Sequence, residues 1–145
     1  KFSDAAGNFN TDGGDTNNSL SVNFDTVTPT VAVSRATNAT LGGTGSTAAT
    51  ETITFTLSEA SSDFTLADVQ VSGGTLSGFT GSGKSYSATF TPTQDSTTAA
   101  SISVASDKFS DAAGNLNTDG AEANNTVTMA TNTTSNTHRT SSPWN

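Results

Sequence analysis

A long internal repeat constrains this sequence more than any other feature. Residues 1–18 read KFSDAAGNFNTDGGDTNN, and residues 108–125 read KFSDAAGNLNTDGAEANN. At this offset of 107 residues, 14 of the 18 positions are identical without a gap. The period is too long for the stacked units of a solenoid and favours an array of whole domains. We therefore predict the C-terminal loop and strand of a preceding repeat at 1–24, one complete repeat at 25–129 and a polar tail at 130–145.

Apolar residues alternate with polar ones inside the complete repeat. Ile53, Phe55 and Leu57 are separated by threonines. A period of two over a short run predicts a strand with one buried face, and threonine suits the outer face because its branched Cβ fits a pleated surface. With 29 Thr and 21 Ser in 145 residues, the composition excludes a helical bundle. The same alternation recurs at Val31, Val33, Val69, Val71, Tyr86, Ala88, Phe90, Ile102, Val104, Val127 and Met129.

Turn-forming residues separate these alternating runs. They include Gly42-Gly43, Gly73-Gly74, Gly81-Ser82-Gly83 and Pro92. The segment Gly81–Lys84 lacks the spacing of a phosphate-binding loop, so we predict a hairpin turn there. Seven short strands in about 100 residues are typical of an Ig-like sandwich. We therefore predict an all-β fold, a seven-stranded Ig-like β-sandwich with strands near 30–34, 50–57, 68–72, 75–79, 85–91, 100–105 and 125–129.

The composition also excludes several classes of function. The sequence has no cysteine and a single histidine, His138 in the polar tail, which excludes thiol chemistry and most acid–base constellations. Its net charge of −8 disfavours a nucleic-acid partner, because phosphate binding needs clustered Lys and Arg. No run of 18 apolar residues occurs, so we expect no membrane insertion. Paired carboxylates could suggest glycoside hydrolysis, but a small sandwich offers no deep cleft, and we predict no enzyme.

Four sequence strings carry a resemblance to a known family. They are DTVTPTVAVS at 25–34, ITFTLSEASSDFTLADVQVSGGTLSGFTGSG at 53–83, YSATFTPT at 86–93 and ISVASDKFSDAAGN at 102–115. In this order they resemble the bacterial Ig-like repeats of giant secreted adhesins, the RTX-type and biofilm-associated surface proteins. The resemblance implies an extracellular, tandemly repeated sandwich that holds an adhesive domain away from the bacterial cell surface. It also implies stiffening by Ca²⁺ near domain junctions and no enzymatic activity.

The topology of such a sandwich gathers acidic residues at one pole. The first strand starts at the same end as the loops that follow the second and sixth strands. Like charges gathered there repel, and a hard dication with six to eight oxygen ligands would relieve the repulsion. A solvated acidic rim is the alternative. Asp63 shares this pole. Asn115 is expected to cap a turn, and a role as a metal ligand is the alternative for it. The predicted Ca²⁺ ligands are Asp25, Glu59, Asp68, Asp111 and Asp119.

These features predict a non-catalytic spacer module of a bacterial extracellular adhesin or surface fibre, stiffened by calcium. The alternative is a carbohydrate- or ligand-binding module that uses the acidic loop pole, with a surface glycan as its partner. Leu20, Val22 and Phe24 alternate with polar residues, so segment 1–24 offers an apolar strand face that it cannot bury alone. Either this segment docks on a neighbouring copy by strand addition, which builds a head-to-tail filament, or it is separated from the repeat body that it closes.

Overall fold

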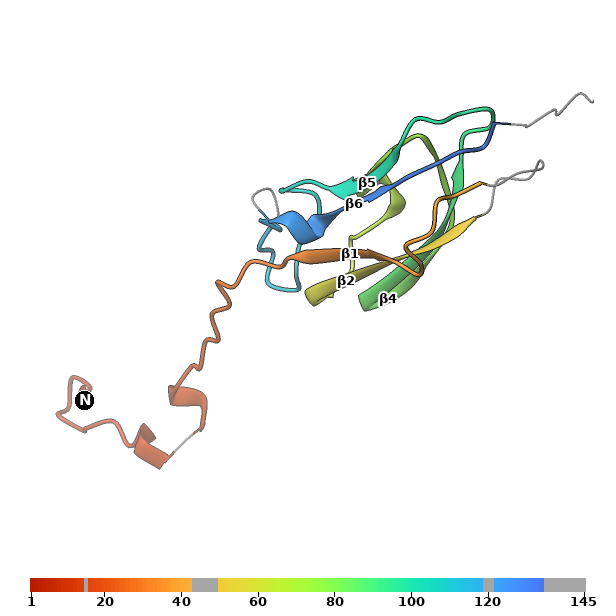
Figure 1. The fold of residues 1–145 in the computed structure, drawn as a ribbon. Coiled ribbons are helices and arrows are strands. Elements are labelled where there is room, and N and C mark those ends of the chain that lie inside the picture. The colour runs from red at the N-terminus through yellow and green to blue at the C-terminus, as the bar shows by residue number, and fades with distance from the viewer. Residues whose placement is uncertain (15, 43–49, 119–121, 135–145) are drawn as a thin grey trace, which may run out of the picture.

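The computed structural model describes residues 1–14, 16–42, 50–118 and 122–134, and Figure 1 shows their arrangement. Within these ranges the regular elements are strands and short 3₁₀ helices. The strands are β1 (Val31–Arg35), β2 (Glu51–Ser61), β3 (Val69–Ser72), β4 (Gly74–Pro92), β5 (Ala100–Val104) and β6 (Thr126–Met129). The 3₁₀ helices are η1 (Asp12–Gly14), η2 (Thr16–Asn18), η3 (Leu66–Asp68) and η5 (Ala123–Asn125).

The strands form two antiparallel sheets. One sheet has the order β1-β2-β4, with Phe55 of β2 opposite Val33 of β1 and Tyr86 of β4. The other has the order β3-β5-β6, with Ile102 of β5 opposite Val71 and Val127. Because one face of each sheet is apolar, the two sheets pack face to face over a common core. The predicted all-β Ig-like sandwich is confirmed.

Strand β4 contains both of the strands predicted at 75–79 and 85–91. At its open end, the backbone N–H of Thr93 donates a 2.9 Å hydrogen bond to the carbonyl oxygen of Gly73. A bond between the two ends of a 19-residue stretch requires the chain to reverse between them. The described residues therefore form six continuous strands where the sequence predicts seven, because the two arms of one hairpin run together without a break.

Glycines form the closed end of this hairpin. A Cβ on Gly81 would meet the carbonyl oxygen of Ser85, so the two arms approach closely there. Gly83 has a φ of 62°, the left-handed conformation that a tight hairpin turn requires and that glycine adopts without strain. The hairpin turn predicted at Gly81–Lys84 is thus confirmed. With the hairpin counted as two strands, the sheets match the four-plus-three arrangement of an Ig sandwich.

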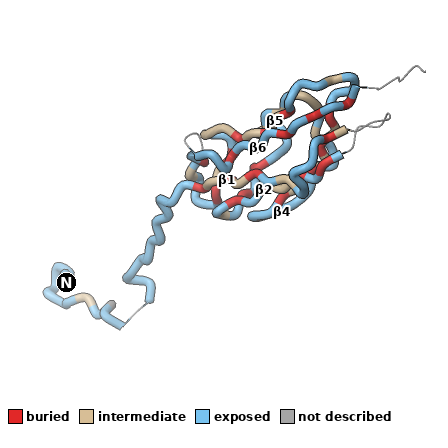
Figure 2. The backbone as a smooth tube through the Cα atoms, in the orientation of Figure 1, coloured by how far each residue is buried: buried red, intermediate tan, exposed pale blue. Residues whose placement is uncertain are grey.

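The alternating apolar residues face the core, as Figure 2 shows along the strands. Ile53, Phe55 and Leu57 are 0%, 0% and 2% exposed, with polar residues between them on the outer face. Phe64, in the loop after β2, lies at the centre of an aromatic cluster. Its ring centroid is 5.1–5.6 Å from those of Phe55, Phe79, Tyr86 and Phe109.

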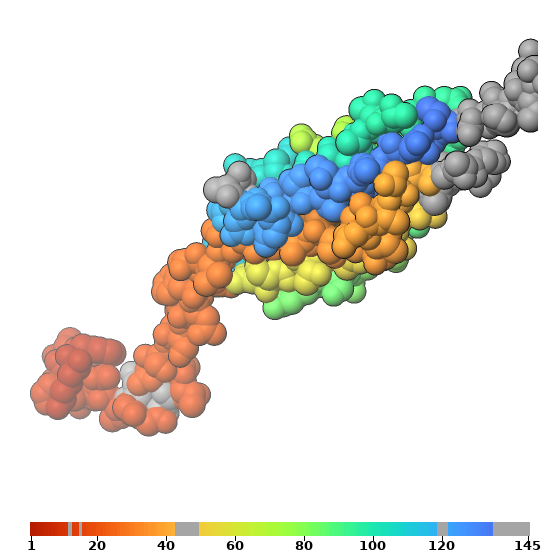
Figure 3. All heavy atoms as spheres, viewed as in Figure 1, coloured from red at the N-terminus to blue at the C-terminus, as the bar shows by residue number. Residues whose placement is uncertain are grey.

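The N-terminal segment lies apart from this core. Of the residues from 1 to 28 whose burial is described, all are exposed except Asn10, and Figures 1 and 3 show the segment extending away from the sandwich. Residues 19–24, which the sequence offers as an apolar strand face, form no strand. An isolated strand without a pairing partner is marginal in water, which accounts for this difference.

The residues after β6 continue along the sandwich. Leu41 pairs with Thr131 in a parallel bridge, and the Asn132 N–H donates a 2.8 Å hydrogen bond to the Leu41 carbonyl oxygen. Thr131 and Thr133 are 6% and 8% exposed. His138 and the rest of 135–145 lie outside the described residues.

Candidate metal centre

Three carboxylates from distant parts of the sequence meet at the end of the sandwich where the chain enters β1. Asp25 precedes β1, Glu59 lies near the end of β2, and Asp111 lies in the loop after β5. Each offers one oxygen, and the three oxygens lie within 4.8 Å of one another. Two ligands on opposite sides of a Ca²⁺ ion are about 5 Å apart, given Ca–O distances of about 2.3–2.6 Å. The spacing of these three oxygens therefore fits a shared calcium ion.

A tight turn holds Asp111 in place. Its Oδ1 accepts hydrogen bonds from the backbone N–H groups of Ala113 (2.8 Å) and Asn115 (2.9 Å), and its Oδ2 accepts one from Asn115 Nδ2 (2.9 Å). Gly114 permits the turn with a φ of 91°. Burial acts to raise the pKa of Asp111, but the hydrogen bonds from Asn115 and Ala113 outweigh it and lower that pKa. The charged form of the Asp111 carboxyl group is therefore favoured.

The same turn is hydrogen-bonded to the linker that carries Asp25, the residues 25–30 that lead into β1. Asn115 Nδ2 also donates to the backbone carbonyl of Asp25 (3.1 Å), and Asp25 Oδ1 accepts from the Val27 N–H (3.1 Å). Farther along, the Thr118 N–H donates to the Pro29 carbonyl oxygen (3.2 Å). Asn115 thus caps the turn, as predicted, and links it to the entering chain.

Glu59 lies in β2 rather than in the loop after it, where the sequence placed it. The pairing of β2 with β4 shifts register between Thr56 and Ser61, and this irregularity lets the strand continue past Glu59. Burial, a hydrogen bond with Asp111 and the negative charges of Asp25 and Asp111 raise the pKa of Glu59. Lys84 partly offsets this increase in the pKa. Burial first, and then the neighbouring carboxylates, therefore disfavour the charged form of Glu59.

The remaining predicted ligands stand elsewhere. Asp68 is not a member of the cluster. Its Oδ2 accepts hydrogen bonds from the Thr65 N–H (2.7 Å) and Oγ1 (3.0 Å) in the capping box of η3. Asp63 binds the loop of Asp111 instead: its Oδ1 and Oδ2 accept from the N–H (2.9 Å) and Oγ (2.7 Å) of Ser110. Asp119 lies outside the described residues.

Sequence reasoning missed one cation beside the cluster. Lys84 Nζ donates a 2.8 Å hydrogen bond to the carbonyl oxygen of Ser58, next to Glu59 in the chain. The hairpin of β4 carries this lysine toward the end of β2, because Gly83 lies opposite Ser61. The only sequence signal was a hairpin turn that ends in a lysine, and it did not indicate which strand the lysine reaches.

The raised pKa of Glu59 predicts how the stability of the metal-free domain depends on pH. A carboxyl group with a higher pKa in the folded state binds more protons there, so its contribution is most favourable at low pH and is lost as pH rises through the folded pKa. Without metal, stability should therefore increase as pH falls from 7 toward the ordinary Glu value of 4.5. Asp111 acts oppositely, but only below its ordinary value of 3.8.

Melting curves in EDTA between pH 7 and 5 test this prediction. The variant Glu59→Gln separates the contribution of this group from those of the other titratable groups. The wild-type curve should gain more stability on acidification than the curve of Glu59→Gln. Equal pH dependence of the two proteins would show that Glu59 has no raised pKa in solution.

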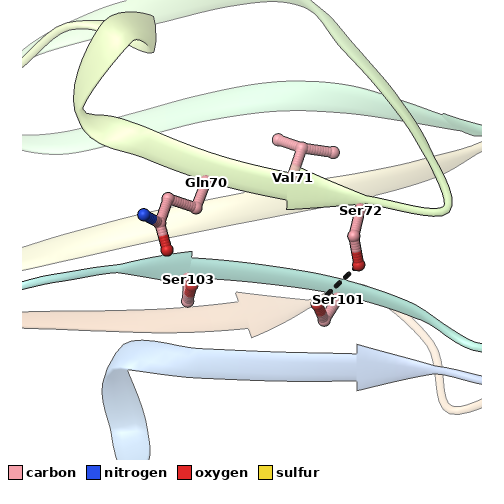
Figure 4. A pocket seen from close by; sticks show the side chains of 5 residues that line it. All are labelled: Gln70, Val71, Ser72, Ser101 and Ser103. Carbon is pink, nitrogen blue, oxygen red and sulfur yellow. Dashed lines mark hydrogen bonds between the residues drawn. The ribbon is translucent and has the colours of Figure 1, made fainter.

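A second surface feature is a hollow on the outer face of β3 and β5. Figure 4 shows its lining, in which Ser72 and Ser101 share a 2.9 Å hydrogen bond between their hydroxyls. The lining has no charged group, and its hydroxyl pair is already satisfied internally. The lining residues are Gln70, Val71, Ser72, Ser101 and Ser103.

Comparison with known proteins adds one finding. Residues 25–137 match the family described as bacterial Ig-like domain. Neither the curated proteins nor the solved structures include a match to the chain. Among the described residues, no helix is long and apolar enough to cross a membrane. The matched range contains both sheets and all three carboxylates of the cluster, and it covers most of the sequence. The chain therefore belongs to the family of bacterial Ig-like domains.

Proposed function

We propose that this chain is a non-catalytic spacer module of a bacterial extracellular adhesin or surface fibre, with Ca²⁺ as a structural ion at the pole formed by Asp25, Glu59 and Asp111. Domains of this family usually occur in surface proteins and are generally non-catalytic. An extracellular location would supply the calcium. Neighbouring copies of the same repeat are the proposed partners, since the sequence of the segment before Asp25 repeats at 108–125.

The observation that carries this proposal is the origin of the three carboxylates. Glu59 and Asp111 belong to the sandwich, whereas Asp25 belongs to the linker through which the preceding segment enters it. An ion bound to all three would join the linker to the sandwich by metal–ligand bonds. Such a joint limits the angles that two successive modules can adopt. A spacer benefits from that stiffness, because a stiff array projects farther than a flexible one.

The competing hypothesis is a glycan-binding module that uses the acidic pole. Charged clusters suit cations better than neutral sugars, and two of the hydroxyls in the hollow on the outer face of β3 and β5 already bond to each other. Binding on a glycan array that Asp111→Asn abolishes would favour this hypothesis over the spacer.

Calorimetric titration with CaCl₂ at pH 7.5 tests the calcium part of the proposal. The wild-type chain should bind one ion at this pole, and Asp111→Asn should lose that binding. Asp4→Asn is the matched control, because Asp4 forms the same turn with Asn8 but is not part of the cluster.

The outcomes of this titration are distinct. Loss of binding in Asp111→Asn with retention in Asp4→Asn supports the site. The proposal is contradicted if the wild-type chain gives no binding heat, or if both variants bind like the wild type. The three carboxylates would then be a solvated acidic rim.

A further inference from the structure

Residues 1–10 form the same local structure as residues 108–117, although they lie away from the sandwich. Asp4 Oδ1 accepts from the N–H groups of Ala6 and Asn8, both at 2.9 Å, as Asp111 does from Ala113 and Asn115. The bridge between Ser3 and Phe9 corresponds to that between Ser110 and Leu116. The glycines of the two turns, Gly7 and Gly114, have φ values of 86° and 91°. This turn is therefore encoded locally and forms without a sandwich beneath it.

The surroundings of segment 1–24 and of its equivalent at 108–129 differ. Phe109 is 0% exposed and its ring centroid lies 5.1 Å from that of Phe64, whereas the equivalent Phe2 is 68% exposed. Met129 is 1% exposed, whereas the equivalent Val22 is 56% exposed. Segment 1–24 thus has the side chains that close a sandwich but no sandwich to receive them.

The complete repeat shows what receives such a segment. Residues 108–129 pack on three features of 25–107. The edge of β5 pairs with β6, placing Ile102 opposite Val127. The ring of Phe64 receives Phe109, and the carboxylate of Asp63 accepts two hydrogen bonds from Ser110. A partner for 1–24 must therefore offer an open strand edge, an aromatic socket and a carboxylate in this arrangement.

A second intact copy of this chain does not meet that requirement. Its own residues 108–129 already occupy the socket. Insertion of 1–24 would expose those residues in exchange, including Phe109 and Met129, so little net apolar area would be buried. Association also carries a cost in translational and rotational freedom. Displacement between intact copies therefore has no net driving force.

We infer that residues 1–24 are the closing segment of a second Ig-like repeat and seat on a body of the same kind as 25–107 that lacks its own last strand. This inference rests on the proposed tandem spacer, and it identifies the surface through which one module is completed. Leu20 and Val22 would pair with the edge strand of that body, as Val127 and Met129 pair with β5. Phe2 would fill its aromatic socket.

The test fuses a second copy of residues 25–107 directly before Lys1 of the full chain. Lys1 then follows the added copy as Lys108 follows Asp107. Amide hydrogen exchange is measured in EDTA, so that calcium plays no part. In the fusion, exchange at Leu20 and Val22 should slow by about a hundredfold or more relative to the unfused chain, because the segment joins a cooperative fold.

A control fusion carries Phe2→Ala and Val22→Asp. It should lose the protection at 1–24 and in the added copy, while residues 108–129 stay protected. If Leu20 and Val22 exchange as fast in the first fusion as in the unfused chain, the inference is wrong. If the chain binds no calcium but the amides of 1–24 are protected in the first fusion, the proposed calcium-stiffened function is contradicted and this inference still holds.

Discussion

Replacing Phe109 with alanine should lower the free energy of unfolding by about 3–5 kcal/mol, whereas Phe2→Ala should change it by less than about 0.5 kcal/mol. Both residues stand in the same sequence, KFSDAAGN, and in the same local turn. Phe109 fills the core against Phe64, but Phe2 is 68% exposed. The difference in destabilisation between the two variants therefore measures tertiary packing, because the local sequence is the same.

Urea unfolding of the two variants and the wild type measures this difference directly. An unchanged slope of free energy against urea would assign the change to stability alone. If Phe2→Ala destabilised the chain as much as Phe109→Ala, segment 1–24 would be packed in solution, contrary to the structure.

Glu59→Gln should have opposite effects with and without calcium. Without metal, it removes one of three mutually repelling carboxylates and should raise the melting temperature slightly. With calcium at 100 times its dissociation constant, binding stabilises the wild type by about 2.7 kcal/mol, which corresponds to roughly 10 °C for a domain of this size. The variant should lose most of that increase, because it lacks a charged ligand.

Melting curves in EDTA and in CaCl₂ check both effects. Asp95→Asn is a suitable control, because it removes a carboxylate at the other end of β5. Asp95 precedes that strand, whereas Asp111 follows it. The control should keep the wild-type response to calcium. A calcium response that is equal in all three proteins would place the ion elsewhere.

The two sheets could be predicted from sequence because their signals are local and redundant. Alternation gives the inward face of each strand, and a shift of one residue would turn all of Ile53, Phe55 and Leu57 to solvent. Glycines with positive φ fix the hairpin of β4 independently. Neither signal depends on knowledge of distant contacts.

The candidate site was predictable only in part. Topology correctly brought Asp25, Glu59 and Asp111 together, because strand order decides which loops share a pole. It could not show that Asp68 lies outside this group of carboxylates. The contact of Asp68 with Thr65 did have a local signal, since the two residues have the spacing of a capping box.

Two other features depended on how β2 pairs with the hairpin of β4. The register shift in β2 that places Glu59 beside Asp111 has no clear local pattern, because it arises where β2 meets the hairpin of β4. The approach of Lys84 to Ser58 likewise depends on the length and twist of that hairpin. Both arise from tertiary pairing, which residue types alone do not specify.

Calcium is expected to join the entering linker to the sandwich, and backbone ¹⁵N relaxation at Thr26 and Val27 tests this effect most directly. These residues follow Asp25 and are exposed. The heteronuclear NOE at both should rise on addition of calcium to the level of β1 in the wild type, but not in Glu59→Gln. A linker whose NOE stays unchanged while calcium binds to the wild-type chain would contradict the account.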